Sequence, residues 1–534
     1  MKQIDVLPDD VLLEIFDFYM IMHLADEGKR GIESWQSLVH VCRRWRNLVF
    51  RSPRRLNLRL FCTPKTPAKD KLDIWPVLPL IVGGIMSSTS GMDNIIAALR
   101  QSNRVKRVIL WGLADWQLEK VLVGMQVSFP ELTDLRLISD DETLPVIPGS
   151  FLDGSAARLL YVDLHGIPFP SLPRLFLSAT HLVTLLLSNI PHSGYISPEA
   201  MVALLCALSS LETLHLGFRS PQSRPDRESR HRLPLKRSIL PVLREFYFTG
   251  VTEYLEDFMT FIDALQLNKM DITFFNQIDF DCPQLVQFIN RTPTLMARNE
   301  AHVRFKDYSA GVGLPAGSRT LEMAISCREP DWQLSSIEQV CNFSLPVFTI
   351  EDLYIEHEYS KLVWKDDAIE NTVWLHLLLP FTAVKDLYLS NEFAPGIAAA
   401  LKALHELVGG SITEVLPNLE NIFVKELKQS GPFQKDIGPF VAARQLSGHP
   451  ITISSWHLPS SWATWQGKYI LFYLSEMTLH TRTAQPGVEY TPPPSEPTIH
   501  LAPSRGLFGP RSPRTPPDRA QTTGLWATWQ GKYN

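Results

Sequence analysis

A short hydrophobic motif, apolar-x-x-apolar-x-apolar, recurs along the chain between about residue 75 and residue 455. Successive side chains of a strand point to opposite faces, so the alternating apolar positions of the motif would share one face of a sheet. The motif is found at Val105-Val108-Leu110, Leu132-Leu135-Leu137, Leu159-Val162-Leu164, Leu182-Leu185-Leu187, Leu211-Leu214-Leu216, Leu243-Phe246-Phe248, Leu267-Met270-Ile272, Ile350-Leu353-Ile355, Val384-Leu387-Leu389 and Leu419-Ile422-Val424. Each occurrence predicts one short strand with one buried face.

Helical patterns lie between the predicted strands. They cover residues 92–99, 116–127, 198–208, 254–265 and 398–408. The first seven motifs start 27, 27, 23, 29, 32 and 24 residues apart, and most of these intervals fit the leucine-rich-repeat period of about 20 to 29 residues. Repeated strand-helix units stack on their neighbours, so the sequence predicts an α/β solenoid whose strands line the concave side.

Two features leave an alternative open. The repeats have no regular asparagine ladder, so the predicted domain is leucine-rich-repeat-like rather than a regular leucine-rich repeat. Alternating strands and helices also build doubly wound sheets, which makes a closed α/β domain the second interpretation.

The first sixty residues follow a helical period instead. Leu7-Pro8-Asp9-Asp10 is typical of a helix start, because proline fits the first turn and acids favour the positive end of the helix dipole. Apolar residues then recur every three or four positions, at Val11, Leu12, Ile15, Phe16 and Tyr19 and again at Trp35, Leu38, Val41, Cys42, Trp45, Leu48 and Val49. These two or three short helices are too small to be stable alone, so their apolar faces need a partner or the next domain.

Residues 5–60 resemble an F-box. The segments LPDDVLLEIFDFY and WQSLVHVCRRWRNLVFRSPRRLNLRL contain the Leu-Pro opening, the Ile-Phe pair and the Val-Cys-x-x-Trp segment of that family, with an insertion at about residues 20–33. The layout of the chain also resembles large F-box families of mushroom-forming fungi. The resemblance implies binding of the Skp adaptor subunit, and the interface candidates are Leu7, Pro8, Leu12, Ile15, Phe16, Val41, Cys42 and Trp45. Periodicity alone leaves a helical cap over the repeat domain equally open.

Composition excludes several classes of partner. The 534 residues carry a formal net charge of -5, so no global field attracts nucleic acid or anionic lipid, and neither partner is expected. Six cysteines without a CxxC pair favour a reducing compartment. The apolar runs are too short to span a bilayer, so we expect no membrane association and a cytoplasmic or nuclear location.

Motifs for catalysis are missing from the sequence. HExxH, GxSxG and GxxxxGK[ST] are absent, so we expect no enzyme, no catalytic residue, no cofactor and no metal. Gly311, Gly313 and Gly317 have the wrong spacing for a phosphate loop and are predicted to lie in a surface loop, while His357 is predicted to lie in a solvated turn. A hydrolase in the middle domain is the enzymatic alternative, and clustered Ser, His and Asp side chains would favour it.

Two segments depart from the repeat pattern. Residues 219–237 are rich in arginine and are interpreted as a solvated loop, with contact to an acidic target or a nuclear-import signal as alternatives. Prolines crowd the chain after residue 480, which predicts disorder. The octapeptide WATWQGKY at 462–469 returns unchanged at 526–533. A duplicated exon end or a misassigned reading frame explains this better than an aromatic docking motif that is used twice.

The sequence as a whole predicts a non-enzymatic adaptor. Residues 1–60 form the all-α F-box domain, 61–75 a linker, 76–456 the leucine-rich-repeat-like α/β domain, and 457–534 a largely disordered tail. The F-box would bind a Skp subunit and through it a cullin, and the repeat domain would hold an unknown target protein for ubiquitin transfer. The alternative is an F-box scaffold or sensor that binds Skp or other partners without assembling a ligase.

Overall fold

The computed structural model of the chain describes residues 7–456. The gaps are 25–33, 74–76, 87–90, 142–143, 170–174, 223–236, 276–279, 281, 297, 328, 344, 358–370, 408–414 and 428–430. The chain divides into two units, Met1–His457 and Leu458–Asn534. The predicted disordered tail and both copies of the octapeptide lie outside the described residues.

The first unit is mixed α/β and is built on one mostly parallel sheet of sixteen strands. Its strands, in sheet order, are β1 (Leu60–Cys62), β2 (Leu80–Ile85), β3 (Val105–Trp111), β4 (Asp134–Ile138), β5 (Tyr161–His165), β6 (Thr184–Ile190), β7 (Thr213–Phe218), β9 (Glu245–Gly250), β11 (Lys269–Phe275), β14 (Arg319–Ser326), β13 (Ser309–Ala316), β12 (Glu300–Lys306), β15 (Asp352–His357), β16 (Asp386–Leu389), β17 (Asn421–Lys425) and β18 (Thr452–Trp456). Two short strands, β8 (Ser238–Ile239) and β10 (Ile262–Asp263), pair separately.

The ten predicted strands are confirmed. Each hydrophobic motif coincides with one strand of the sheet, in the order β3, β4, β5, β6, β7, β9, β11, β15, β16 and β17. Every apolar residue of these motifs is at most 2% exposed. At about 25 cal/mol per Å² of buried apolar surface, these rows supply much of the driving force for folding.

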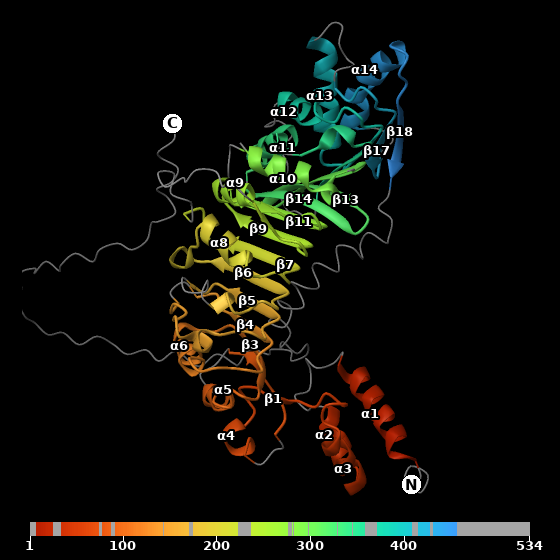
Figure 1. Cartoon of the computed structure of the whole chain (residues 1–534). Helices are drawn as coiled ribbons and strands as arrows, with labels where there is room; N and C mark the ends of the chain where they lie inside the picture. Colours follow the sequence, from red (N-terminus) through yellow and green to blue (C-terminus); the bar gives the residue numbers. More distant parts are fainter. Residues whose placement is uncertain are drawn as a thin grey trace, which may run out of the picture. The chain divides into compact units, whose positions relative to one another are not determined.

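Helices lie along one side of this sheet (Figure 1). They are α4 (Ala68–Lys71), α5 (Met92–Leu99), α6 (Asp115–Gly124), α8 (Pro198–Leu205), α9 (Thr252–Phe261), α10 (Pro283–Arg291), α11 (Pro330–Phe343), α12 (Asn371–Leu378), α13 (Ala394–Leu407) and α14 (Pro432–Leu446). Each of the five predicted helical segments corresponds to one of them, with ends that differ by a few residues. The strands alternate between buried and half-exposed positions, because helices cover one face of the sheet and leave the other open.

This arrangement differs from a doubly wound sheet. Strands β1 to β7, β9 and β11 follow one another in the sheet without reversing direction, and so do β15 to β18. A doubly wound sheet reverses its strand order and buries both faces. The closed α/β alternative is therefore not what the structure shows.

The one break in this order is a meander of three strands, β12, β13 and β14. Strand β13 is antiparallel to both neighbours, so the chain crosses back before β15 continues the parallel series beside β12. The predicted surface loop at Gly311 and Gly313 is wrong, because both glycines lie buried in the middle of β13. A Cβ at Gly311 would lie 3.1 Å from the Met323 carbonyl oxygen, so the neighbouring strand leaves little room for a side chain. Only Gly317, with φ of 62°, lies in the following turn.

Candidate functional site

Three short helices form the N-terminal segment, as the helical period predicted. They are α1 (Asp9–Leu24), α2 (Ser34–Val39) and α3 (Arg43–Arg51). Phe16 on α1 is fully buried and its ring lies 4.7 Å from the ring of Trp45 on α3. Leu12, one turn earlier on α1, is also fully buried. The inner face of α1 therefore packs against the other helices of the same chain.

Polar contacts fix the beginning of α1 to α3. The guanidinium of Arg44 donates through Nη2 to the Leu7 carbonyl at 2.6 Å and to the Asp9 carboxylate at 2.6 Å. Cys42 caps α3, because its sulfur accepts from the backbone N–H of Trp45 at 3.4 Å. The Leu-Pro and Val-Cys-x-x-Trp segments are thus neighbours in space although they lie about 35 residues apart in the sequence.

The opposite face of α1 exposes apolar side chains. Val11, Ile15 and Phe18 are spaced by four and three residues, so they share one side of the helix. Ile15 is 46% exposed and Phe18 is 66% exposed. We call these three residues the α1 outer face. Contiguous exposed apolar side chains of this kind mark surfaces that bind other proteins.

The eight predicted Skp-binding residues divide between interior and surface. Leu12 and Phe16 are buried, Leu7, Cys42 and Trp45 are half-buried, and Pro8, Ile15 and Val41 are exposed. Val11 and Phe18 complete the exposed face but were not among the eight. The spacing of residues 11, 15 and 18 was the signal for them. The helical period predicts a single apolar stripe, because the residues on the buried face and on the exposed face of α1 are both apolar.

The second candidate surface is the half-exposed face of the large sheet, here called the open sheet face. Strand pairing aligns its central positions into one row across the sheet, through register pairs such as Leu186 with His215 and His215 with Tyr247. The row contains Ile109, Arg136, Asp163, Leu186, His215, Tyr247, Asp271, Glu322, Gly313, His302, Tyr354, Tyr388, Phe423 and Ser454. These side chains are of mixed chemistry, as expected of a face that meets solvent or a partner.

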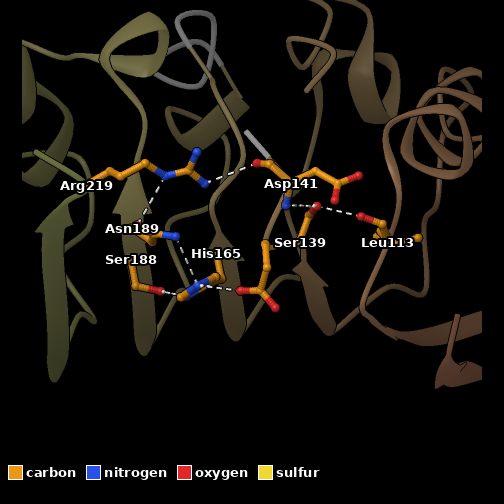
Figure 2. A network of polar contacts seen from close by, with 8 residues as sticks. Leu113, Ser139, Asp141, His165, Ser188, Asn189 and Arg219 are labelled. Atoms are coloured by element: carbon orange, nitrogen blue, oxygen red, sulfur yellow. Dashed lines mark hydrogen bonds and ion pairs between the residues drawn. The ribbon is translucent and has the colours of Figure 1, made fainter. Parts of the chain in front are cut away.

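A chain of polar contacts crosses this face at the carboxyl ends of β4 to β7 (Figure 2). Its members are Leu113, Ser139, Asp140, Asp141, His165, Ser188, Asn189 and Arg219. His165 Nδ1 lies 2.8 Å from Ser188 Oγ, and His165 Nε2 lies 3.5 Å from Asp140 Oδ1. A serine, a histidine and an aspartate are therefore clustered, which is the arrangement that would favour the hydrolase alternative.

The hydrogen bonds around His165 do not single out Ser188 as a nucleophile. Arg219 Nε can only donate, so its 3.3 Å contact makes Asn189 Oδ1 the acceptor and turns the Asn189 amide nitrogen toward His165. That nitrogen lies 3.4 Å from His165 Nε2, and Asp140 Oδ1 lies 3.5 Å from the same ring nitrogen, so one neighbour would donate to Nε2 and the other would accept from it. Burial lowers the pKa of His165, and Asp140 only partly opposes this, so the neutral ring is favoured.

A catalytic base would have to accept the serine proton at Nδ1 and be oriented by a carboxylate at Nε2. The carboxyl side chain of Asp140 is 85% exposed, so solvent screens its charge at the imidazole. The network links the carboxyl ends of four strands and orients their side chains.

Asp271 on β11 gives the open sheet face a pH dependence. Burial raises its pKa to about 7, and the charge of Glu322, its register partner on β14, adds to this, while Lys269 and Lys306 oppose it. A carboxyl whose folded pKa exceeds its unfolded pKa stabilises the fold at low pH, and this contribution is lost as the pH rises through 7. We expect the D271N variant to exceed the wild type in free energy of unfolding by about 2 kcal/mol at pH 8 and by less at pH 5.

Urea denaturation of both proteins between pH 4 and pH 8 measures this difference. The matched control is Asp163→Asn, which changes another half-exposed aspartate in the same row. A stability difference between D271N and the wild type that stays constant over this pH range would contradict the assignment.

Other chemistry is limited within the described residues. They contain no group of three or more His, Cys, Asp or Glu side chains arranged to hold a metal ion.

His357 ends β15 rather than lying in a solvated turn, and its ring packs edge-on to Phe393 at 5.6 Å. None of the described helices is both long enough and apolar enough to cross a bilayer. Arg219 is the one arginine of the predicted solvated loop that joins the network of Figure 2, and residues 223–236 lie outside the described part.

Comparisons with known proteins add no family to these observations. No protein-family model matches the chain, and a search of curated proteins finds no match.

Proposed function

We propose that the chain is the substrate-recognition adaptor of a Skp/cullin/F-box ubiquitin ligase. Residues 1–60 act as the F-box and bind the Skp subunit, and the leucine-rich-repeat-like solenoid at 76–456 binds the target protein. The chain itself makes and breaks no bond, needs no cofactor and acts in the cytoplasm or nucleus. Ubiquitin transfer is promoted by proximity, since a held target is attacked at a high effective concentration.

The observation that carries this proposal is the α1 outer face. The inner face of α1 is already filled by Phe16 and Leu12, yet Ile15 and Phe18 remain in contact with water. An apolar face left outside a completed small core is stabilised when a second protein covers it. Its place in the segment that resembles an F-box favours a Skp subunit as that protein.

The sheet supports the second half of the proposal. Its strands follow in sequence order over most of their number, and one face is left without helices. These are features of a leucine-rich-repeat-like solenoid, in which the uncovered strands offer an extended surface to a partner. The Asp140, His165 and Ser188 cluster gives the hydrolase alternative little support, because Asp140 is 85% exposed and solvent screens its charge at the imidazole.

Co-expression of the full chain with a Skp subunit tests the proposal. We expect the two proteins to co-purify, and we expect changing Leu7 and Pro8 together to alanine to abolish co-purification, because the Leu7 side chain packs against the core and Pro8 fixes the first turn of α1. Recovery of Skp with the double variant at the wild-type level would count against the assignment.

The scaffold or sensor alternative makes a different prediction in the same experiment. A ligase adaptor brings down a cullin together with Skp. A scaffold recovers Skp alone.

A further inference from the structure

Four rings form a continuous stack on the open sheet face. His302, Tyr354, Tyr388 and Phe423 occupy aligned register positions on β12, β15, β16 and β17. Their centroids are 4.4, 4.2 and 4.6 Å apart in this order, and the interplanar angles are 3°, 7° and 10°. We call this set the aromatic ladder. The separations follow from the strand spacing of about 4.8 Å, because each ring stands on its strand beside the next.

The aromatic ladder is held rigidly. Trp456 on β18 packs edge-on to Tyr354 at 6.0 Å and to Tyr388 at 5.6 Å, and its indole nitrogen donates to the Leu389 carbonyl at 3.2 Å. His302 is fully buried at one end, with Nε2 2.7 Å from Glu300 and Nδ1 3.5 Å from Glu356. A surface whose side chains are already fixed loses little conformational entropy when it binds a partner.

A row of carboxylates runs beside the ladder. Glu300, Asp352 and Asp386 are register neighbours on β12, β15 and β16. Each lies two residues before a ring of the ladder on the same strand, so it points to the same face of the sheet. We call these three residues the acidic row. Glu300 is paired with His302, and Asp386 accepts from the Asn421 amide at 2.7 Å. Within the described residues, no lysine or arginine forms an ion pair with these three carboxylates. Burial and the neighbouring carboxylates raise the pKa of Asp352, which is the effect of like charges crowded together.

On strands β3 to β5 the open sheet face carries its own cations. Arg107 on β3 pairs with Asp134 on β4 at 3.2 Å, and the guanidinium of Arg136 lies 4.1 Å from the ring centroid of Tyr161. There the chain supplies its own cations to its acids and aromatic rings. In the acidic row, Asp352 and Asp386 have no lysine or arginine partner among the described residues, so a cationic partner can approach them beside the aromatic ladder.

We propose that the aromatic ladder and the acidic row together form the docking site for an extended peptide segment that carries lysine or arginine side chains. Tyr354, Tyr388 and Phe423 are half-buried, so a partner meets the parts of these rings that the neighbouring rings and Trp456 leave uncovered, and the alkyl part of a basic side chain packs there. The ammonium or guanidinium group then reaches the carboxylates. From Glu300 to Asp386 the row spans two strand spacings, about 10 Å, which three residues of an extended chain cover.

This inference deepens the proposed function, since the peptide would belong to the target protein, but its test needs no Skp subunit. The probe is a fluorescent twelve-residue peptide of four Arg-Ser-Leu repeats, and the comparison peptide has four Glu-Ser-Leu repeats. Fluorescence anisotropy with the full chain measures both affinities. We expect the arginine peptide to bind at least tenfold more tightly, with an affinity that falls as salt is added.

Two variants locate the binding. D352N combined with D386N keeps the size of both side chains and removes their charge, and Y388L removes the centre of the ladder. Each variant is expected to weaken binding of the arginine peptide at least tenfold. The matched control, E119Q combined with E131Q, removes two carboxylates from exposed positions away from the ladder and should change the affinity less than twofold.

Circular dichroism of D352N/D386N keeps the test decisive if Y388L fails to fold. Equal binding of the two peptides, no binding of the arginine peptide, or an equal loss in the carboxylate variant and its control would each overturn the docking site. If the chain binds the arginine peptide but does not recover a Skp subunit in co-expression, the ligase proposal is wrong and the docking site is retained.

Discussion

Replacing Ile15 by glutamate is expected to abolish binding of the Skp subunit while leaving the chain folded. Ile15 is 46% exposed at the middle of the α1 outer face, so a glutamate side chain there reaches water in the free protein. Exposed substitutions of this kind change stability by about 0.5 kcal/mol or less. In a complex the same carboxylate would be buried without a partner, which costs several kcal/mol and weakens binding by about a hundredfold or more.

The affinity of purified I15E for a purified Skp subunit, measured by titration calorimetry, checks this expectation. Val123→Glu is the matched control, because Val123 is an exposed valine on α6 that the proposal assigns to no partner. The V123E variant should bind Skp as the wild type does. Equal affinities of I15E and V123E would show that the α1 outer face is not the interface.

Replacing Phe16 by alanine is expected to destabilise the N-terminal helices strongly, whereas I15E leaves them folded. The Phe16 side chain is fully buried and contacts the ring of Trp45, so truncation removes apolar contact and leaves a cavity. Such changes cost about 3 to 5 kcal/mol. For a segment of only three helices this exceeds the stability that its small core supplies.

Limited proteolysis between residues 7 and 51, followed by mass spectrometry, measures the effect. Phe18→Ala is the matched control, because it makes the same change on the same helix at a position that is 66% exposed. Rapid cleavage of F16A beside wild-type resistance of F18A is the expected pattern. Similar cleavage of both would mean that the inner and outer faces of α1 have been assigned wrongly.

The strands of the sheet were predictable because their signal is local. A motif such as Leu419-Ile422-Val424 places its apolar residues on one face of any strand, and the pleat alone then decides which side chains are buried. The meander β12–β14 was missed because Gly311, Gly313 and Pro315 lower the strand propensity of β13. Pairing with a strand on each side overrides that local preference.

The open sheet face was less predictable, because it depends on which strands are neighbours. One signal was present: the segments DLYI at 352–355, DLYL at 386–389 and NIFV at 421–424 put an aromatic residue at the same motif position three times in succession. Consecutive repeats place these rings side by side. His302 could not be added from the sequence, because β12 reaches β15 only through the reversed meander.

The buried and exposed faces of α1 could not be distinguished from the sequence. Leu12 and Phe16 face inward while Val11 and Ile15 face outward, yet all four are apolar. Periodicity identifies the helix, and only the packing of α2 and α3 decides which stripe is covered. A binding face that is itself apolar therefore cannot be separated from the core by hydrophobicity alone.

The stoichiometry of the complex formed when the wild-type chain is co-expressed with a Skp subunit and a cullin shows whether the chain is a ligase adaptor. We expect one stable assembly with one copy of each protein, held through the α1 outer face. A chain that purifies as a stable monomer in the presence of excess Skp, with Ile15 and Phe18 still open to solvent labelling, would contradict it.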